Sequence, residues 1–181
     1  MITASQIVHL RTASDDFEET ERLKAEFTKL REERKPFYLT LEEFDRILRW
    51  TLRGHYPRQR VLRTANTDDV VRAVTRCVFA LSLDDKEYEL ELRINLLRAL
   101  RGVEIPVASA VLALVLPDEY AVINFRNWRQ VFGEERRTFS LSDYKSYLEK
   151  IRPLARELGW RVQEVDLAIW EYDKRHPPAQ R

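Results

Sequence analysis

Apolar residues recur along this chain at spacings of three and four, the period of an amphipathic α-helix with one buried face. Between residues 15 and 34, for example, Leu23, Phe27 and Leu30 fall near helical spacing among charged residues. Patterns of this kind predict helices over residues 15–34, 41–53, 67–81, 85–100, 107–116, 124–132, 141–158 and 165–172. The predicted fold class is therefore all-α, with seven or so helices in one compact bundle.

Residues that favour helix ends stand beside these patterns. Thr40-Leu-Glu-Glu43 has the form of a capping box, in which a threonine and a glutamate bond each other's backbone amides. The predicted N-caps are Ser14, Thr40, Asn66 or Thr67, Asn124 and Ser140, and the predicted ends are Pro36, Gly54, Gly133 and Gly159.

The stretch 88–94 allows a second interpretation, because apolar and charged residues alternate there as they do in a strand. A row at helical spacing, formed by Leu92, Leu96 and Leu100, continues past this stretch without interruption. We therefore expect a helix.

The length of the chain, 181 residues, fits a single domain or two closely packed lobes. We expect one helical domain over residues 1–181, made of an N-terminal helical arm over 1–39 and a core over 40–181.

Composition places the chain among folded proteins, since 44% of its residues are hydrophobic and 34% are charged. Cys77 is the single cysteine, so the chain forms no internal disulfide and no four-cysteine iron–sulfur cluster. A reducing, cytoplasmic setting is expected. Cys77 stands within an apolar helical face and is predicted to be buried. The three histidines lack metal-ligand spacing, and we expect neither a metal nor a cofactor.

No secretion signal or membrane span is expected. The first ten residues lack a basic head followed by a sustained apolar run. The longest apolar run, over residues 107–116, has ten residues, whereas a bilayer requires about 20. We interpret this run as a buried core helix.

The distribution of charge is more informative than the net charge of +1. The window 46–67 contains no acidic residue and has a formal charge of +6. Its basic residues are Arg46, Arg49, Arg53, Arg58, Arg60 and Arg63, together with His55. Arginine outnumbers lysine 24 to 7, which gives many planar groups suited to phosphate or carboxylate, although a GC-rich or heat-adapted source explains the excess equally well. We call residues 46–67 the arginine window.

A helical hairpin is predicted by the sequence Leu97-Arg-Ala-Leu-Arg-Gly-Val-Glu-Ile-Pro-Val-Ala-Ser-Ala-Val-Leu-Ala-Leu-Val115. Gly102 permits a tight turn, and Pro106 suits the first residue of the second helix. Backbone amides at such a helix start attract phosphate through hydrogen bonds and the helix dipole. An ordinary tight connection between two helices would have the same pattern.

This hairpin, followed by Val122-Ile-Asn-Phe-Arg-Asn-Trp-Arg129, resembles the helix-hairpin-helix DNA glycosylase superfamily. The resemblance covers residues 90–129 in detail and the order of helices over 40–172. It implies a glycosylase-like core of two helical lobes, a cleft for an extruded base, and DNA as the partner. With the arginine window, it predicts DNA contacts at Arg101, Gly102, Val103, Ile105, Val107, Arg58, Arg60, Arg126 and Arg129.

Three residues depart from the family pattern. Glu104 stands where the family hairpin has a second glycine, and Pro106 stands where bifunctional members have a lysine nucleophile, which excludes lyase chemistry by that route. Asn124 stands where the family has its catalytic aspartate, and an amide has no charge with which to stabilise a cationic sugar. The resemblance thus implies a DNA-binding relative of base-excision glycosylases that is weakly active or inactive.

Two further interpretations remain open. The chain is an active monofunctional glycosylase if another acid, such as Asp118 or Glu119, replaces the family aspartate. It is a non-catalytic protein-interaction module if the arginine window meets an acidic protein partner. The structural alternative for Asn124 is a plain N-cap, and for Arg126 and Arg129 it is salt bridges with Glu134, Glu135 or the C-terminal helix.

Overall fold

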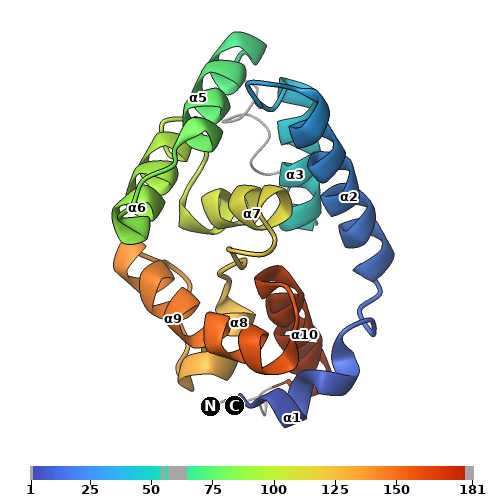
Figure 1. Cartoon of the computed structure of the whole chain (residues 1–181). Coiled ribbons are helices and arrows are strands. Elements are labelled where there is room, and N and C mark those ends of the chain that lie inside the picture. Colours follow the sequence, from blue (N-terminus) through green and yellow to red (C-terminus); the bar gives the residue numbers. More distant parts are fainter. Residues whose placement is uncertain (1, 54–55, 57–64, 178–181) are drawn as a thin grey trace. The chain divides into compact units, whose positions relative to one another are not determined.

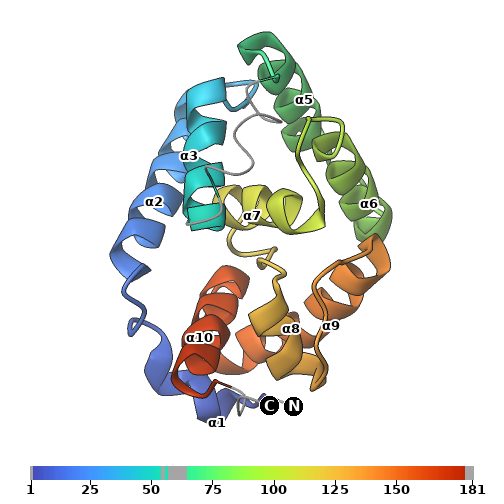
Figure 2. The ribbon, with the colours of Figure 1, turned by 180° about the vertical axis from the view of Figure 1, so that it is seen from behind.

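The computed structural model describes residues 2–53, 56 and 65–177 (Figures 1 and 2). Within these residues the regular structure is entirely helical, so the all-α prediction is confirmed. The helices are α1 (Ala4–Ile7), the 3₁₀ helix η1 (Val8–Leu10), α2 (Phe17–Glu33), α3 (Leu41–Leu52), α5 (Asp68–Ala80), α6 (Lys86–Leu97), α7 (Ile105–Val115), α8 (Phe125–Phe132), α9 (Leu141–Leu158) and α10 (Val162–Arg175).

The chain divides into two compact units, which are described separately. Unit 1 consists of Met1–Ala25 and Leu112–Arg181, and unit 2 is the continuous stretch Glu26–Val111. The boundaries fall inside α2 and α7, so the N-terminal arm expected over residues 1–39 contributes to both units.

Unit 2 is built around α3, α5 and α6, and α5 and α6 run side by side (Figures 1 and 2). The predicted capping box forms at Thr40, whose hydroxyl accepts the N–H of Glu43 while the Glu43 carboxylate accepts the N–H of Thr40. Thr75, which is fully buried, accepts the N–H of Leu39 at 2.9 Å. The start of α3 is thereby fixed to α5.

The predicted helix over 85–100 is confirmed as α6, with Asp85 as its N-cap. Glu89 and Arg93, one turn apart, form a buried ion pair at 2.6 Å. Glu89 also accepts the N–H of Leu83, and Arg93 donates to the Leu81 carbonyl, so the pair holds the connection from α5 to α6. A buried carboxylate and guanidinium are tolerated because each finds several partners.

Unit 1 is organised around α10, which contacts α1, η1, α8 and α9. Every residue from Val162 to Ile169 is buried. The N-terminal segment is tied to this part of the chain by Gln6, which donates to the Tyr172 hydroxyl, and by Arg11, which pairs with Glu164 at 3.0 Å. The burial of α10 all round explains why it includes polar residues that need partners inside the unit.

Most predicted helix ends agree with the structure. Thr67, Asn124 and Ser140 are N-caps, and Gly133 and Gly159 follow α8 and α9 in the left-handed conformation. The apolar helix α7 begins one residue before the predicted Pro106, at Ile105. The end predicted at Gly54 lies outside the described residues. No helix in the described part of the chain is both long and apolar enough to span a membrane.

One prediction about α5 is wrong. Cys77 is exposed rather than buried, and Val70 on the same side of the helix is 45% exposed. The buried face is formed instead by Val71, Thr75 and Val78. Thr75 can face inward because its hydroxyl donates to the Val71 carbonyl and accepts the Leu39 N–H, which removes the cost of burying it.

Candidate nucleic-acid interface

The connection between α6 and α7 is a tight hairpin turn. Gly102 has φ of 75°, in the left-handed region that a side chain disfavours, so this glycine is required by the turn. The N–H of Val103 donates to the Leu100 carbonyl at 3.2 Å, and the N–H of Leu100 donates to the Leu97 carbonyl at 3.1 Å. These bonds close the turn in the way the sequence predicted.

The start of α7 offers the hairpin's backbone donors. Ile105 and Val107 stand in the first turn, where amide N–H groups have no partner inside the helix, and Pro106 has no N–H to offer. The side chains of Val103, Ile105 and Val107 are buried. Any contact that these three residues make with a ligand must therefore be made by their backbone, and the N–H of Val103 is already donated to the Leu100 carbonyl.

Asn66 holds the hairpin to the end of the arginine window. Its side-chain oxygen accepts the N–H of Arg101 at 2.9 Å, and its side-chain nitrogen donates to the carbonyl of the same residue at 2.9 Å. Asn66 is itself buried, whereas Arg101 is exposed. The two bonds fix the backbone of the turn and leave the Arg101 guanidinium at the surface. The predicted contact residues Arg58 and Arg60 lie outside the described residues.

Glu104 is the acidic residue of the hairpin. Its side chain is 74% exposed and pairs with Arg98 at 3.1 Å. An exposed pair of this kind is worth about 0–1 kcal/mol, so it restrains the two side chains only weakly. Its charge nevertheless opposes an approaching phosphate.

Asn124 is the N-cap of α8, in unit 1. Its side-chain oxygen accepts the N–H groups of Arg126 and Asn127, both at 3.0 Å. The side-chain oxygen thus serves as the cap, and the remaining amide nitrogen is a neutral donor. The residue therefore has a complete structural role that needs no catalysis.

Arg126 and Arg129 are held by the C-terminal helix through Asp173, whose side chain is fully buried. Arg129 donates from Nε and Nη2 to the two Asp173 oxygens at 2.5 and 2.6 Å, and Arg126 donates from Nη1 at 3.1 Å. Gln130 adds a fourth bond at 2.8 Å. Burial acts to raise the pKa of Asp173, but the bonds from Arg129, Gln130 and Arg126 outweigh it and hold the pKa below its usual range.

Arg129 is further engaged by Glu135 at 3.2 Å. It lines a surface pocket of about 220 Å³ together with Gln130, Gly133, Glu134, Glu135 and His176. The positive charge of Arg129 is offset by Glu134 and Glu135 in this lining and by its ion pair with Asp173. The pairing with Glu135 and the C-terminal helix is the alternative that sequence analysis left open for these two arginines.

A second buried carboxyl in α10 was not predicted. Burial raises the pKa of Asp166 well above its usual value, although Asp166 accepts the N–H of Val122 and a bond from Gln163 at 3.3 Å. Asn127 lies nearby, donating to the Asp166 carbonyl at 3.0 Å and to the Tyr147 hydroxyl at 3.2 Å. The available signal was a set of polar residues on the inner face of a helix otherwise rich in apolar ones.

Among the described residues no group of three or more histidine, cysteine, aspartate or glutamate side chains could hold a metal ion. In comparisons with known proteins, no family model, curated protein or solved structure matches this chain. The function therefore has to be argued from the chain's own residues.

Proposed function

We propose that this chain binds DNA through the α6–α7 hairpin and the arginine window, and that it has little or no glycosylase activity. The observation that carries the proposal is the pair of hydrogen bonds between the Asn66 side chain and the backbone of Arg101, one donated by each residue. They join the end of a segment with a formal charge of +6 to a glycine turn at a helix N-terminus. The turn favours phosphate by its amide groups. The segment favours it by formal charge, part of which is neutralised within unit 2, since Arg46 pairs with Glu26 and Arg49 pairs with Asp45.

Arg126 and Arg129 contribute less to this proposal than the sequence suggested. Their guanidinium groups share the buried carboxylate of Asp173, and Arg129 also pairs with Glu135. A phosphate would have to compete with these carboxylates. The proposed contacts therefore come from the amides of the hairpin and from Arg101, Arg58 and Arg60.

The salt dependence of binding tests the proposal. A labelled duplex is titrated with protein at several salt concentrations, and we expect affinity to fall by orders of magnitude between about 50 and 200 mM if several phosphates are contacted. Arg101→Ala should lower the slope of log K against log salt by about 1. Arg156→Ala removes one exposed arginine at the end of α9 and is the matched control, which should leave the slope unchanged. A flat salt response, or no binding at low salt, contradicts the proposal.

Glu104→Gln provides a second test at the hairpin. The variant removes a charge that opposes phosphate without altering side-chain size, so it should bind duplex more tightly than the native chain. The free energy of unfolding should change little, because the pair with Arg98 is exposed. Unchanged affinity would count against the hairpin as the contact surface.

The catalytic part of the proposal depends on Asn124. Aspartate is as good an N-cap as asparagine, so Asn124→Asp should keep the two bonds at the start of α8 and fold normally. Base release is compared between the two proteins on duplexes with damaged bases. Activity gained only by the aspartate variant supports an inactive scaffold, whereas equal activity in both proteins points to an active enzyme that uses another acid.

A second candidate is a protein-interaction module, which is favoured by the internal pairing of Arg126 and Arg129 with Asp173. In that case the arginine window meets an acidic protein surface. The same titration separates the two, because a module without a nucleic-acid role binds no duplex at low salt and is unaffected by Glu104→Gln.

A further inference from the structure

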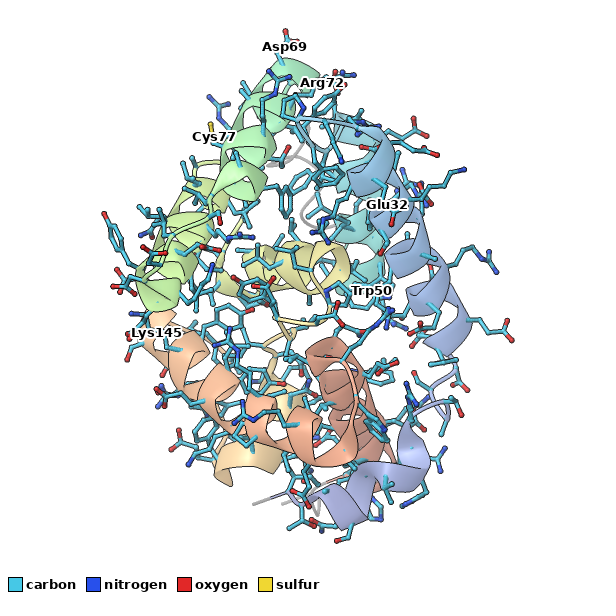
Figure 3. All side chains as sticks on the ribbon, in the orientation of Figure 1. Glu32, Trp50, Asp69, Arg72, Cys77 and Lys145 are labelled. Atoms are coloured by element: carbon cyan, nitrogen blue, oxygen red, sulfur yellow. The ribbon has the colours of Figure 1, made fainter. Side chains whose placement is uncertain are left out.

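Helix α5 is apolar on two faces, but only one of them is covered. Val71, Thr75 and Val78 form the buried face. On the outer face Val70, Ala73, Cys77 and Ala80 are exposed, with the half-exposed Val74 and Leu81 beside them. Figure 3 shows Cys77 standing out from the side of the helix. No charged residue interrupts this strip, which we call the α5 outer strip.

The solvent face of α2 differs from that of α5. The exposed positions of α2 are occupied mostly by charged residues, among them Glu18, Arg22, Lys29 and Glu32. That is the usual pattern for a helix with one face in solvent. A helix whose solvent face is instead apolar along its length is typical of a contact with another protein surface.

Two charges border the α5 outer strip along one edge. Asp69 and Arg76 are seven residues apart, which is almost two full turns, so they stand on the same edge about 10 Å apart along the helix. Both side chains are exposed, and neither forms an ion pair within the described part of the chain. The Arg76 guanidinium lies 5.3 Å from the centre of the Tyr38 ring, and none of the ion pairs among the described residues includes it.

This edge is complementary to itself. When two identical helices pack antiparallel about a two-fold axis, the same edge of each helix meets, and residues equally far from the axis on opposite sides become neighbours. An axis near residues 72–73 puts Asp69 of one copy beside Arg76 of the other, and the second pair follows by symmetry. The same axis passes close to Ala73, the middle of the row formed with Val70 and Cys77, where a small side chain lets two helices approach closely.

We propose that the α5 outer strip pairs with the same strip of a second copy of this chain, antiparallel and about a two-fold axis near Ala73. This proposal is independent of DNA binding. The strip covers one helix of 13 residues, about 20 Å long, which is well below the area of a permanent dimer. The association is therefore weak and reversible, with a dissociation constant on the order of tens to hundreds of micromolar.

Sedimentation equilibrium over a concentration series tests the proposal. The average mass should rise from 21.6 kDa towards twice that value as concentration increases. Asp69→Arg and Arg76→Asp each place two like charges at the contact, and each should weaken association by about tenfold. Ala73→Glu should abolish it. Circular dichroism of each variant checks that the helices are retained, since all three positions are exposed.

Charge exchange gives the sharpest result. The double variant Asp69→Arg with Arg76→Asp restores both pairs and should associate like the native chain. Mixing the two single variants should also restore association, because each chain then supplies the charge that the other lacks. A contact with an unrelated partner, or a purely apolar self-association, would not show this pattern.

Cross-linking at Cys77 tests the geometry of the proposed pairing. The two Cys77 residues are displaced by about 13 Å along the helices and lie on the facing sides of two helices whose axes are about 8 Å apart. In the proposed pairing their Cα atoms therefore lie about 14 Å apart. This exceeds the limit of about 7 Å for a disulfide, so oxidation alone should not link the copies, whereas a bis-maleimide of matching length should. A chain that stays monomeric at all concentrations, or single variants that associate like the native protein, would overturn the proposal.

Discussion

Asp173 holds three side chains of α8 against α10, and its replacement gives a measurable prediction. Asp173→Asn keeps the size of the side chain but removes its charge and one of its two acceptor oxygens. Arg129, only 15% exposed, then loses the carboxylate that accepts two of its bonds, and Arg126 loses its partner as well. The side-chain nitrogen of asparagine is a hydrogen-bond donor, so it would face other donor groups and could not accept a bond from them.

Breaking a buried ion pair by removing one partner costs about 3–5 kcal/mol, because the remaining charge is left uncompensated. The asparagine keeps one acceptor, so we expect the lower end of that range, about 3 kcal/mol, for Asp173→Asn at pH 7. For a chain of this length each kcal/mol shifts the thermal midpoint by about 2–4 °C, which gives a decrease of roughly 6–12 °C.

The difference in unfolding free energy between the native protein and Asp173→Asn should depend on pH. The pKa of Asp173 is lowered in the folded state, so its stabilisation is fully present above the pKa of the unfolded chain, near 4, and is lost as pH falls through the folded value. Urea denaturation of the native and variant proteins at neutral and acidic pH, followed by tryptophan fluorescence, measures both quantities. Asp15→Asn is the control, since Asp15 is 83% exposed and its pair with Lys174 should contribute nothing measurable.

The reasoning is refuted if Asp173→Asn unfolds at the same urea concentration as the native chain at pH 7. It is also refuted if the difference between the two proteins persists at a pH well below the folded pKa. In the first case the four bonds do not act as an ion-pair network, and in the second the loss has another cause.

Three further predictions concern single side chains. Asp166→Asn should stabilise the chain, relative to the native protein, increasingly as pH rises above about 4. Burial raises the folded pKa of the Asp166 carboxyl, so the native protein loses stability from the unfolded pKa up to the folded one. Urea titrations across pH measure the difference in unfolding free energy between the two proteins, and a difference that does not change with pH would contradict the prediction. Gly102→Ala should cost about 1 kcal/mol in thermal unfolding, and Gly102→Asn less, because asparagine tolerates a positive φ. Glu89→Gln should cost about 3 kcal/mol, since it leaves Arg93 buried without its carboxylate, and an unchanged midpoint would show that the pair is dispensable.

The helices could be predicted because their signals are local. Thr40, Asn124 and Ser140 cap helices as expected, since a short polar side chain and the amides it accepts lie within a few residues. The orientation of α5 could not be predicted in this way. Its apolar residues surround most of the helix, and its buried face includes the polar residue Thr75. One of the two bonds that satisfy the Thr75 hydroxyl comes from Leu39, which is far away in sequence.

In the candidate site, too, contacts between residues far apart in sequence could not be predicted. Either Asn66 or Thr67 was expected to cap α5, and the structure assigns the cap to Thr67, which leaves Asn66 for the hairpin. No sequence pattern singled out Asp173, which is followed by the charged residues Lys174 and Arg175. Its partners Arg126 and Arg129 are more than forty positions away, and no local pattern connects them.

The division of the chain between its units separates the order of synthesis from the order of folding. Unit 2 is one continuous stretch, so all of its residues have been made once Val111 is added. Residues 2–25 are made before unit 2, yet their partners in α8 and α10 are made after it, as the bonds from Ile2 to Gln130 and from Gln6 to Tyr172 illustrate. The apolar side chains of residues 2–25 are therefore covered only after α10 has been made, so this segment stays exposed to aggregation, proteases and chaperones while all of unit 2 is synthesised.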